Sequence, residues 1–204
     1  MRRSRTEKDE SRRQILAAAA RLFRERGVDG VTVAEVMQAA KLTHGGFYRH
    51  FADKDDLVAR AVASALEDGR EGNAGSAGQN LAAFAASYLT EKHRDNAGSG
   101  CVFASLGPEL ARGSAPARHV TTEAIQRTIE AFAPTAPGRN DAERREAAIG
   151  TWAAMVGALV LSRLSDDRAF AQEVLDATHA WLTRQGLREG DGDVGVEPNP
   201  SGGG

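Results

Sequence analysis

The sequence predicts an all-α protein in which a small N-terminal domain of short helices precedes a larger C-terminal helical bundle. Three observations predict this fold class. The chain is rich in alanine, the strongest helix former. Apolar residues recur at intervals of three and four in one segment after another. No segment shows the alternation of apolar and polar residues that is typical of a strand.

Composition excludes several classes of protein. Of the 204 residues, 41% are hydrophobic and 26% are charged, which is typical of a globular chain and not of a disordered one. The longest uncharged apolar stretch, 147–162, is shorter than the roughly 20 residues that span a bilayer. The N-terminus lacks the apolar segment of a secretory signal, and the single cysteine forms no disulfide within the chain. We therefore expect a cytoplasmic protein with no membrane partner.

The charges are distributed unevenly along the chain. Residues 1–60 carry 13 Lys/Arg and 9 Asp/Glu, whereas residues 61–204 carry 13 and 19. The net charge of −2 argues against nonspecific coating of nucleic acid, so a specific nucleic-acid site is to be sought at the basic end. Five arginines there form either a minor-groove arm or an ordinary solvated terminus: Arg2, Arg3, Arg5, Arg12 and Arg13.

The first two helices follow a short N-terminal segment. We expect residues 1–9 to be a flexible basic terminus. The first helix runs from Ser11, with apolar residues at helical spacing, and Gly27 stops it. Thr32 is the expected N-cap of a short second helix, and Glu35 three residues later completes a capping box.

A third and a fourth helix complete the small N-terminal domain. After a brief break at 41–42, Thr43 is the candidate cap of a short helix with the sequence HGGFYRHF. Asp53 caps a longer helix over 53–68, in which acidic residues come early, as the helix dipole prefers. We assign 10–56 to the N-terminal domain, with a helix-turn-helix at about 32–51.

The C-terminal part, 57–185, is predicted to be a helical ligand-binding and dimerisation domain. A connector rich in glycine, 69–78, precedes its remaining helices. The tail, 186–204, lacks apolar residues to bury and is expected to be disordered. The expected helices span 79–93, 103–112, 115–132, 141–164 and 166–185.

Two short helices separated by about four residues have the geometry of a helix-turn-helix, whose second helix enters a major groove about 12 Å wide. The apolar residues of the pair are expected to form its core: Val33, Val36, Met37, Leu42, Phe47 and Phe51. The polar and small residues remain available to DNA: Thr43, His44, Gly45, Tyr48, Arg49 and His50. Two glycines in so short a helix cost about 1 kcal/mol each relative to alanine, unless another backbone approaches closely.

The segment VTVAEVMQAAKLTHGGFYRHFADKDDL resembles the DNA-binding segment of TetR/AcrR-family regulators. The resemblance covers about residues 10–60. Nine residues match the usual run of the family in register: Thr32, Ala34, Ala40, Gly45, Tyr48, His50, Phe51, Lys54 and Leu57. Two residues depart from it, since Gly46 stands where the family often has a side chain, and Arg49 where it often has an aromatic residue or histidine.

The resemblance implies a DNA-binding regulator that contacts its operator through a defined set of residues. It places Thr43, His44 and Gly45 near bases, and Tyr48, His50 and Lys54 on flanking phosphates. Arg49 reads guanine or, as we favour, contacts phosphate. The whole predicted DNA-binding set is Thr32, Thr43, His44, Gly45, Gly46, Tyr48, Arg49, His50 and Lys54.

Helix 141–164 is apolar around more than one face and therefore needs two neighbours. The resemblance implies that the last two long helices pair with those of a second copy, giving a two-fold homodimer that binds a near-palindromic operator. A core within one chain is the alternative. The predicted dimer residues are Trp152, Val156, Leu159, Val160, Phe170, Val174 and Trp181.

Cys101, which follows a glycine-rich break, has two interpretations. Single cysteines are most often small buried hydrophobes. A G-C pair before a run such as LGPELAR also resembles one branch of the family, which includes regulators that sense electrophiles or oxidants through cysteine. The commoner expectation is a noncovalent apolar inducer between helices. The candidate ligand-binding residues, which at their helical spacing are also typical of a core, are Phe84, Tyr88, Cys101, Phe103, Leu106, Ile125, Ile129, Trp152 and Met155.

The sequence contains no signature of an enzyme. The five histidines have no metal-ligand spacing, and no phosphate-binding GxxxxGK[ST] occurs, so we expect no catalytic residue, cofactor or metal. The prediction is a regulator, most simply a repressor, that a small-molecule inducer or an electrophile releases from operator DNA. The alternative from another class is a helical ligand-binding or adaptor protein that no longer reads DNA, because Gly46 leaves the reading helix short of a side chain.

Overall fold

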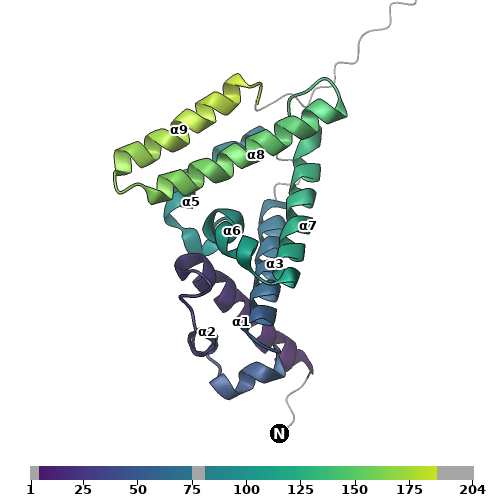
Figure 1. The fold of residues 1–204 in the computed structure, drawn as a ribbon, viewed down its shortest axis with the longest axis vertical. Helices are drawn as coiled ribbons and strands as arrows, with labels where there is room; N and C mark the ends of the chain where they lie inside the picture. Colours follow the sequence, from purple (N-terminus) through teal and green to yellow (C-terminus); the bar gives the residue numbers. More distant parts are fainter. Residues whose placement is uncertain (1–4, 75–80, 188–204) are drawn as a thin grey trace, which may run out of the picture.

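The computed structural model describes residues 5–74 and 81–187, and it confirms the all-α fold class within them (Figure 1). In chain order the helices are α1 (Arg5–Arg26), α2 (Val33–Ala39), the 3₁₀ helix η1 (His44–Arg49), α3 (Lys54–Ala74), α4 (Leu81–Tyr88), α5 (Glu91–Asp95), the 3₁₀ helix η2 (Ala97–Ser99), α6 (Val102–Arg112), α7 (Ala115–Phe132), the 3₁₀ helix η3 (Ala133–Thr135), α8 (Asp141–Leu164) and α9 (Arg168–Arg184).

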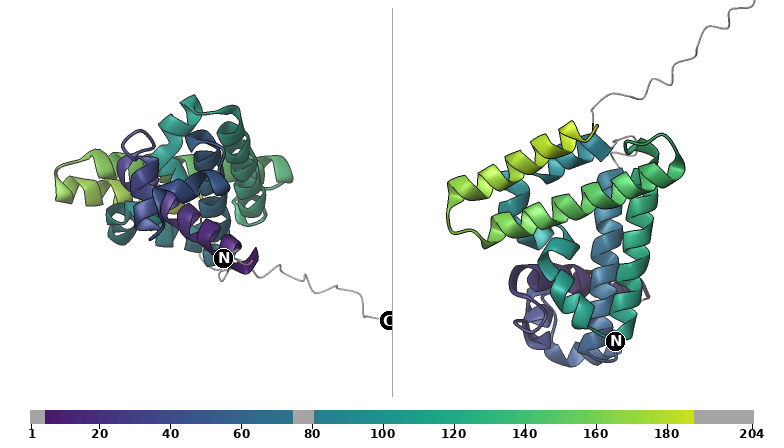
Figure 2. Two further views of the ribbon diagram at one scale, coloured as in Figure 1. Left: turned by 90° about the horizontal axis from the view of Figure 1, so that it is seen from below. Right: turned by 45° about the horizontal axis from the view of Figure 1, so that its top comes forward.

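The N-terminal helices and the last two helices lie at opposite ends of the molecule. The first helices, α1, α2 and η1, form the lower end in Figure 1, and the antiparallel pair of α8 and α9 lies across the upper end. Helices α3 and α7 stand side by side between the two ends, and α6 packs against α1, α3, α7 and α8 (Figure 2). The two ends are therefore joined by several helices.

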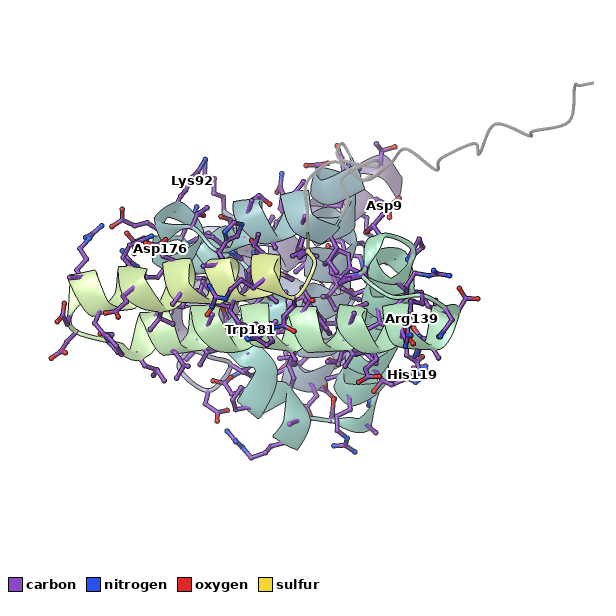
Figure 3. All side chains as sticks on the ribbon, turned by 90° about the horizontal axis from the view of Figure 1, so that it is seen from above. Asp9, Lys92, His119, Arg139, Asp176 and Trp181 are labelled. Carbon is purple, nitrogen blue, oxygen red and sulfur yellow. The ribbon has the colours of Figure 1, made fainter. Side chains whose placement is uncertain are left out.

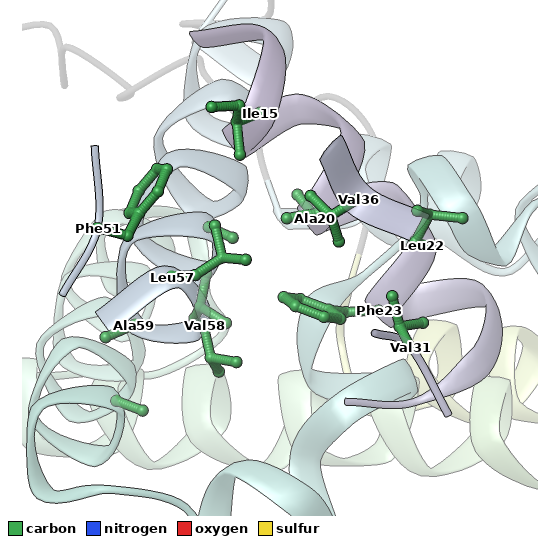
Figure 4. Close-up of a cluster of buried hydrophobic side chains, with 14 of the residues drawn as sticks. Ile15, Ala20, Leu22, Phe23, Val31, Val36, Phe51, Leu57, Val58 and Ala59 are labelled. Carbon is green, nitrogen blue, oxygen red and sulfur yellow. The ribbon is translucent and has the colours of Figure 1, made fainter. Parts of the chain in front are cut away.

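The core of the N-terminal end is built by more than the N-terminal helices. Figure 4 shows its centre, where Phe23 and Val36 face Leu57, the first buried residue of α3. Helix α6 adds a complete apolar face to this cluster, namely Val102, Leu106 and Leu110. The first domain therefore depends on α6 for part of its buried surface.

A second core surrounds α8, the longest helix that the structure describes. Met155 and Leu159 of α8 are fully buried and pack with Leu175 and Leu182 of α9. Of the described helices, α8 alone is long and apolar enough to cross a bilayer by length and composition, a test that core helices also pass. About one third of its most apolar window is buried within the chain. The other apolar residues of this helix are half-buried or exposed.

The first helix begins at Arg5, six residues before the predicted start at Ser11. Residues 5–9, predicted to be flexible, are helical, and residues 1–4 lie outside the described part. Glu10 interacts with both Arg13 and Gln14, so side-chain pairs on the helix surface stabilise the helix across its predicted start. Ser11 is not a cap, since its hydroxyl donates to the carbonyl of Glu7 one turn earlier.

The third and fourth helices also differ from the prediction. The HGGFYR segment is a 3₁₀ helix, in which the Gly46 amide donates to Thr43 and the His50 amide donates to Phe47. Its tighter turn suits a short segment with two adjacent glycines. Asp53 caps α3 as expected by accepting from the amide of Asp56. Helix α3 continues to Ala74, so the predicted connector 69–78 is helical as far as the structure describes it.

Two boundaries in the C-terminal part were wrong for identifiable reasons. The helix predicted at 79–93 is divided into α4 and α5, because the Thr90 hydroxyl caps a new helix at the amide of His93. Leu187, predicted to begin the disordered tail with Gly186, is buried. The amides of Gly186 and Leu187 return to Thr183 and Leu182, which is a Schellman motif with the apolar contact that usually accompanies it. Residues 188–204 lie outside the described part.

Candidate nucleic-acid interface

The start of α2 is a complete capping box, as predicted. The Thr32 hydroxyl accepts from the amide of Glu35, and the Glu35 carboxylate accepts from the amide and the hydroxyl of Thr32. The guanidinium of Arg26 also donates to this carboxylate, at 2.7 Å. The bonds from Thr32, together with Arg26, lower the pKa of Glu35 to about 2. Since its side chain forms this cap, Thr32 helps to place α2.

The predicted core of the helix pair lies where it was expected. Val36, Met37, Phe47 and Phe51 are buried, and the half-buried Val33 and Leu42 pack against them. The rings of Phe47 and Phe51 stack with their centroids 5.6 Å apart, and the guanidinium of Arg12 lies over the Phe51 ring. The apolar face of η1 is therefore held by α1, α2 and α3.

The opposite face of η1 presents the polar residues that the sequence predicted. Tyr48 is 73% exposed, although the residue before it, Phe47, is buried. The other predicted residues are exposed or half-buried: Thr43, His44, Gly45 and Arg49 are exposed, and Gly46, His50 and Lys54 are half-buried. All of them belong to η1 or its flanks, so the structure brings these eight residues together, whereas Thr32, the ninth of the predicted set, lies at the cap of α2.

The two glycines of η1 differ in their surroundings. A Cβ on Gly45 would meet nothing within 4 Å, whereas a Cβ on Gly46 would lie 3.6 Å from Cε of Met37. Both distances leave room for a side chain, and neither glycine has a positive φ. No close approach within the chain therefore compensates the cost of these glycines. The open space at Gly45 lies on the exposed face.

Charge at the start of α3 is mixed. Lys54 opens this helix and is followed by Asp55 and Asp56. The carboxylate of Asp56 accepts from the amide of Ala52 at 3.1 Å and pairs with Arg60. The pKa of Asp56 is lowered although its partial burial opposes this, because Arg60 and the Ala52 amide stabilise the charged form. Asp56 therefore has partners within its own helix end, and Lys54 remains beside η1 as a cation.

One exposed cation of this region was not among the predicted site residues. Lys41 lies in the turn between α2 and η1 with φ of +57°, the one positive φ of a non-glycine residue in the described chain. The amides of Lys41 and Leu42 return to the carbonyls of Gln38 and Met37, which makes this turn a Schellman motif. A lysine in this left-handed conformation is uncommon, because such a backbone favours glycine.

The predicted ligand-binding residues do not form one group. Seven of them belong to the C-terminal core: Phe84, Tyr88, Cys101, Ile125, Ile129, Trp152 and Met155. Phe103 packs edge-on against Trp152, with the ring centroids 4.9 Å apart. Leu106 belongs to the other core, because α6 turns that face toward the N-terminal helices. Leu106 lines a small hollow beside Phe23 and Arg24 that has no room for a water molecule, so it offers no ligand pocket.

Cys101 is half-buried at the N-cap of α6, next to a small polar cluster. Its amide donates to Nε2 of His93 at 3.1 Å, so Nδ1 of His93 carries the proton and donates to the Tyr88 carbonyl at 2.8 Å. Burial, followed by the charge of Arg163, lowers the pKa of His93 and favours this neutral form. Arg163 donates to the carbonyls of His93 and Arg94.

The Tyr88 hydroxyl lies beside the Cys101 thiol. Tyr88 is 6% exposed, and its hydroxyl has no hydrogen-bond partner within the described chain. Burial first, and the neighbouring thiol second, raise the pKa of Tyr88. The thiol thus lies next to a buried hydroxyl, and a Cβ added at the preceding residue, Gly100, would be 3.0 Å from the Arg163 guanidinium.

The predicted dimer residues lie on α8 and α9, and Figure 3 shows Trp181 on this pair of helices. Phe170 and Trp181 are exposed, and Trp152, Val156, Val160 and Val174 are half-buried. Leu159 was wrongly predicted to be at the surface, because it is fully buried against α9 and the rest of the second core. Three exposed apolar residues of α8 were missed, namely Ile149, Leu161 and Leu164.

Comparison with known proteins supports the relationship that the motif indicates. Residues 15–61 match the family model described as bacterial regulatory proteins, tetR family. The chain is 43% identical over 56 residues to the transcriptional regulator AcrR of Shigella flexneri, and 42% identical over 65 residues to the transcriptional repressor BepR of Brucella suis. These matches cover 28% and 32% of this chain, and 26% and 31% of the relatives. The chain thus matches less than a third of the length of these curated relatives.

Similarity of fold extends over most of the chain. A TetR-family regulator from Cytophaga hutchinsonii superposes with a TM-score of 0.73 at 17% identity, covering 89% of this chain and 98% of that one. The reduced form of NemR from E. coli superposes with a TM-score of 0.71 at 19% identity, covering 85% and 95%. At these identities the comparison concerns the fold alone.

Proposed function

We propose that this chain, a member of the tetR family of bacterial regulatory proteins, is a transcriptional regulator that binds double-stranded operator DNA as a homodimer. The simplest form of this proposal is a repressor that a small molecule or an electrophile releases from DNA. The named relatives are transcriptional regulators, so we propose no catalytic activity.

The observation that carries the proposal is the division of η1 into two faces. Phe47 anchors the helix in the core, whereas Tyr48 and Arg49 on its other side are exposed and lie outside the buried cluster. Helix α2 supports η1 from behind, as the first helix of a helix-turn-helix supports the second. Arg49 and Lys54 supply positive charge, and Tyr48 supplies a hydroxyl, which together suit phosphate oxygens that flank a major groove.

The proposed dimer rests on the exposed apolar face of α8 and α9, which we define as Ile149, Leu161, Leu164, Phe170 and Trp181. These side chains are 43–76% exposed in the single chain. Covering them with the same face of a second copy forms a four-helix interface with two-fold symmetry. Such symmetry presents two copies of η1 to DNA, which matches a near-palindromic operator.

A noncovalent inducer is the first of two candidates for the signal that releases DNA. The seven predicted ligand residues of the C-terminal core surround α8, and an apolar molecule inserted among them would act on the helix that also carries the dimer face. The protein has one conformation that fits the operator and one that does not. An inducer of this kind must have the higher affinity for the conformation that does not fit.

Modification of Cys101 is the second candidate, and the polar cluster around the thiol favours it. The thiol is half-buried at the N-cap of α6 beside the Tyr88 hydroxyl, so a group added to its sulfur would disturb both the start of α6 and this buried hydroxyl. The NemR structure is described as a reduced form, so that protein has a redox state. We expect a maleimide, which adds covalently to the thiol sulfur, to release DNA from the wild type but not from Cys101→Ser. Release from both proteins would contradict a sensing role for Cys101.

DNA binding itself is tested by titrating the purified protein against labelled DNA from immediately upstream of its own gene. The titration is made at two salt concentrations, with unrelated DNA as competitor. Tight binding that survives the competitor is expected of a sequence-specific regulator. Weak binding that salt abolishes, on this DNA and on fragments selected from the whole genome, would favour the ligand-binding or adaptor alternative.

A further inference from the structure

The end of α1 leaves one backbone amide that its own helix does not use. Gly27, with φ of +79°, ends α1 by returning its amide to the carbonyl of Phe23 at 2.8 Å. This is the simpler of the two common glycine caps, and it leaves the next amide, that of Val28, without a helical acceptor. At the end of α9 the corresponding amide, that of Leu187, bonds back to its own helix at Leu182.

The Val28 amide instead donates to a carboxylate that lies 81 residues away in the sequence. Oε2 of Glu109, on α6, accepts this hydrogen bond at 2.6 Å. The other carboxylate oxygen lies against Gly27, where a Cβ would approach it to 2.6 Å. A carboxylate gains nothing from the partial negative charge at the end of α1, so the dipole of that helix does not explain its position. The hydrogen bond from the Val28 amide explains the position of the carboxylate.

The turn that Glu109 holds leads directly into the DNA-binding helices. Val31 is fully buried at the end of this turn, and the following residue is Thr32, the cap of α2. Helix α2 in turn supports η1 through Met37, whose Cε lies beside Gly46. A change in the turn after α1 therefore changes the angle at which α2 presents η1.

A second contact between the same two parts of the chain lies nearby. The guanidinium of Arg24 donates to the carbonyl of Gly98, with its Nε at 2.8 Å. The Glu25 side chain also lies against Gly98, where an added Cβ would be 2.4 Å from its Oε1. Arg24 thus fixes the body of α1, whereas Glu109 binds the turn that follows it, where the Arg26 guanidinium also donates to the carbonyl of Gly30.

The geometry points to Glu109 as a positioning residue for DNA binding, supplied to the N-terminal helices by α6. This inference rests on the proposed function, since it concerns the same η1 surface. It also means that the N-terminal helices present η1 correctly only with α6 in place, because α6 contributes both this carboxylate and the buried face of Val102, Leu106 and Leu110.

The test compares three full-length variants with the wild type. Glu109→Asp keeps the charge but is one methylene too short to reach Val28, and Glu109→Gln keeps an acceptor at full length. Glu143→Asp is the matched control. The Glu143 carboxylate also accepts a hydrogen bond from a backbone amide, that of Arg139, but it lies on α8, at the end of the molecule opposite the N-terminal helices (Figure 1). Hydrogen exchange is followed in peptides covering 24–36, and binding is measured on the upstream DNA fragment.

We expect Glu109→Asp to accelerate exchange in 24–36 and to weaken DNA binding, each by about tenfold, whereas Glu109→Gln and the control stay within about threefold of the wild type. Unchanged exchange in Glu109→Asp would overturn the inference, and so would faster exchange with unchanged affinity. Equal loss of affinity in the control would also overturn it. Failure of the wild type to bind any DNA would instead contradict the proposed function, while exchange at Val28 tests the Glu109 contact without DNA.

Discussion

The exposed ring of Tyr48 packs edge-on against the buried ring of Phe47, with the ring centroids 5.2 Å apart. This contact holds the tyrosine ring in place and leaves its hydroxyl in solvent. Tyr48→Phe should therefore keep the stability of the wild type, while a lost hydrogen bond to phosphate lowers DNA affinity by about tenfold. Tyr88→Phe is the matched control, since the other tyrosine of the chain is buried. Equal affinity of both variants, measured by fluorescence anisotropy, would contradict the role of Tyr48.

Lys54 provides a second test because a phosphate contact has a characteristic salt dependence. Lys54→Ala should weaken binding on all sequences and reduce the slope of log K against log salt by about 1. Lys92→Ala removes an exposed lysine of α5, near the opposite end of the molecule, and should leave the slope unchanged (Figure 3). If the slopes of the wild type and Lys54→Ala coincide, Lys54 does not contact phosphate.

Gly45 separates the requirements of DNA binding from those of the fold. A Cβ at this position meets no atom of the chain, so Gly45→Ala should leave the free energy of unfolding unchanged or raise it by up to about 1 kcal/mol. The same Cβ projects from the face proposed to meet DNA and should weaken binding. Gly46 was predicted to contact DNA, but a methyl group added to it points toward Met37, so Gly46→Ala should weaken binding less than Gly45→Ala does. If Gly45→Ala bound DNA with the affinity of the wild type, we would conclude that DNA does not contact this position.

The sequence predicted those parts of the fold that local chemistry determines. The capping box of Thr32 and Glu35 formed as expected, and α7 and α8 begin and end at the predicted residues. The η1 surface was also predicted, because the spacing from Thr32 to Leu57 is specific to one family and the apolar residues within it have one possible core. Each of these features depends on residues that are close in the sequence.

The sequence was less informative about which distant residues each helix packs against. The spacing of α6 shows that Leu106 shares a face with Val102 and Leu110, but not that this face joins the N-terminal core. Helix α8 is apolar on nearly every side, so its sequence does not distinguish the buried Leu159 from the exposed Leu161. The bond between Glu109 and Val28 was missed for the same reason, since nothing near either residue indicates the other.

The dimer face leads to a prediction about oligomeric state. Trp181→Glu places a charge among the exposed apolar residues of α8 and α9, where a buried charge without a partner is strongly unfavourable. In sedimentation equilibrium the variant should have the 21.6 kDa mass of one chain, and the wild type twice that mass. Gln126→Glu introduces the same charge at an exposed position on α7 and should remain dimeric. A dimeric Trp181→Glu would exclude Trp181 from the centre of the interface.

Lys41 adopts a backbone conformation that favours glycine, and this provides a prediction about stability alone. With φ of +57°, its Cβ crowds the following carbonyl oxygen, a strain of about 1 kcal/mol that glycine does not have. Lys41→Gly should therefore raise the free energy of unfolding in urea by up to about 1 kcal/mol, since the greater freedom of glycine in the unfolded chain offsets part of the gain. Lys41→Ala removes the same charge but keeps the Cβ, and its stability should match that of the wild type. If both variants gained equally, the cause would be the lost charge, and the left-handed turn between α2 and η1 would carry no strain.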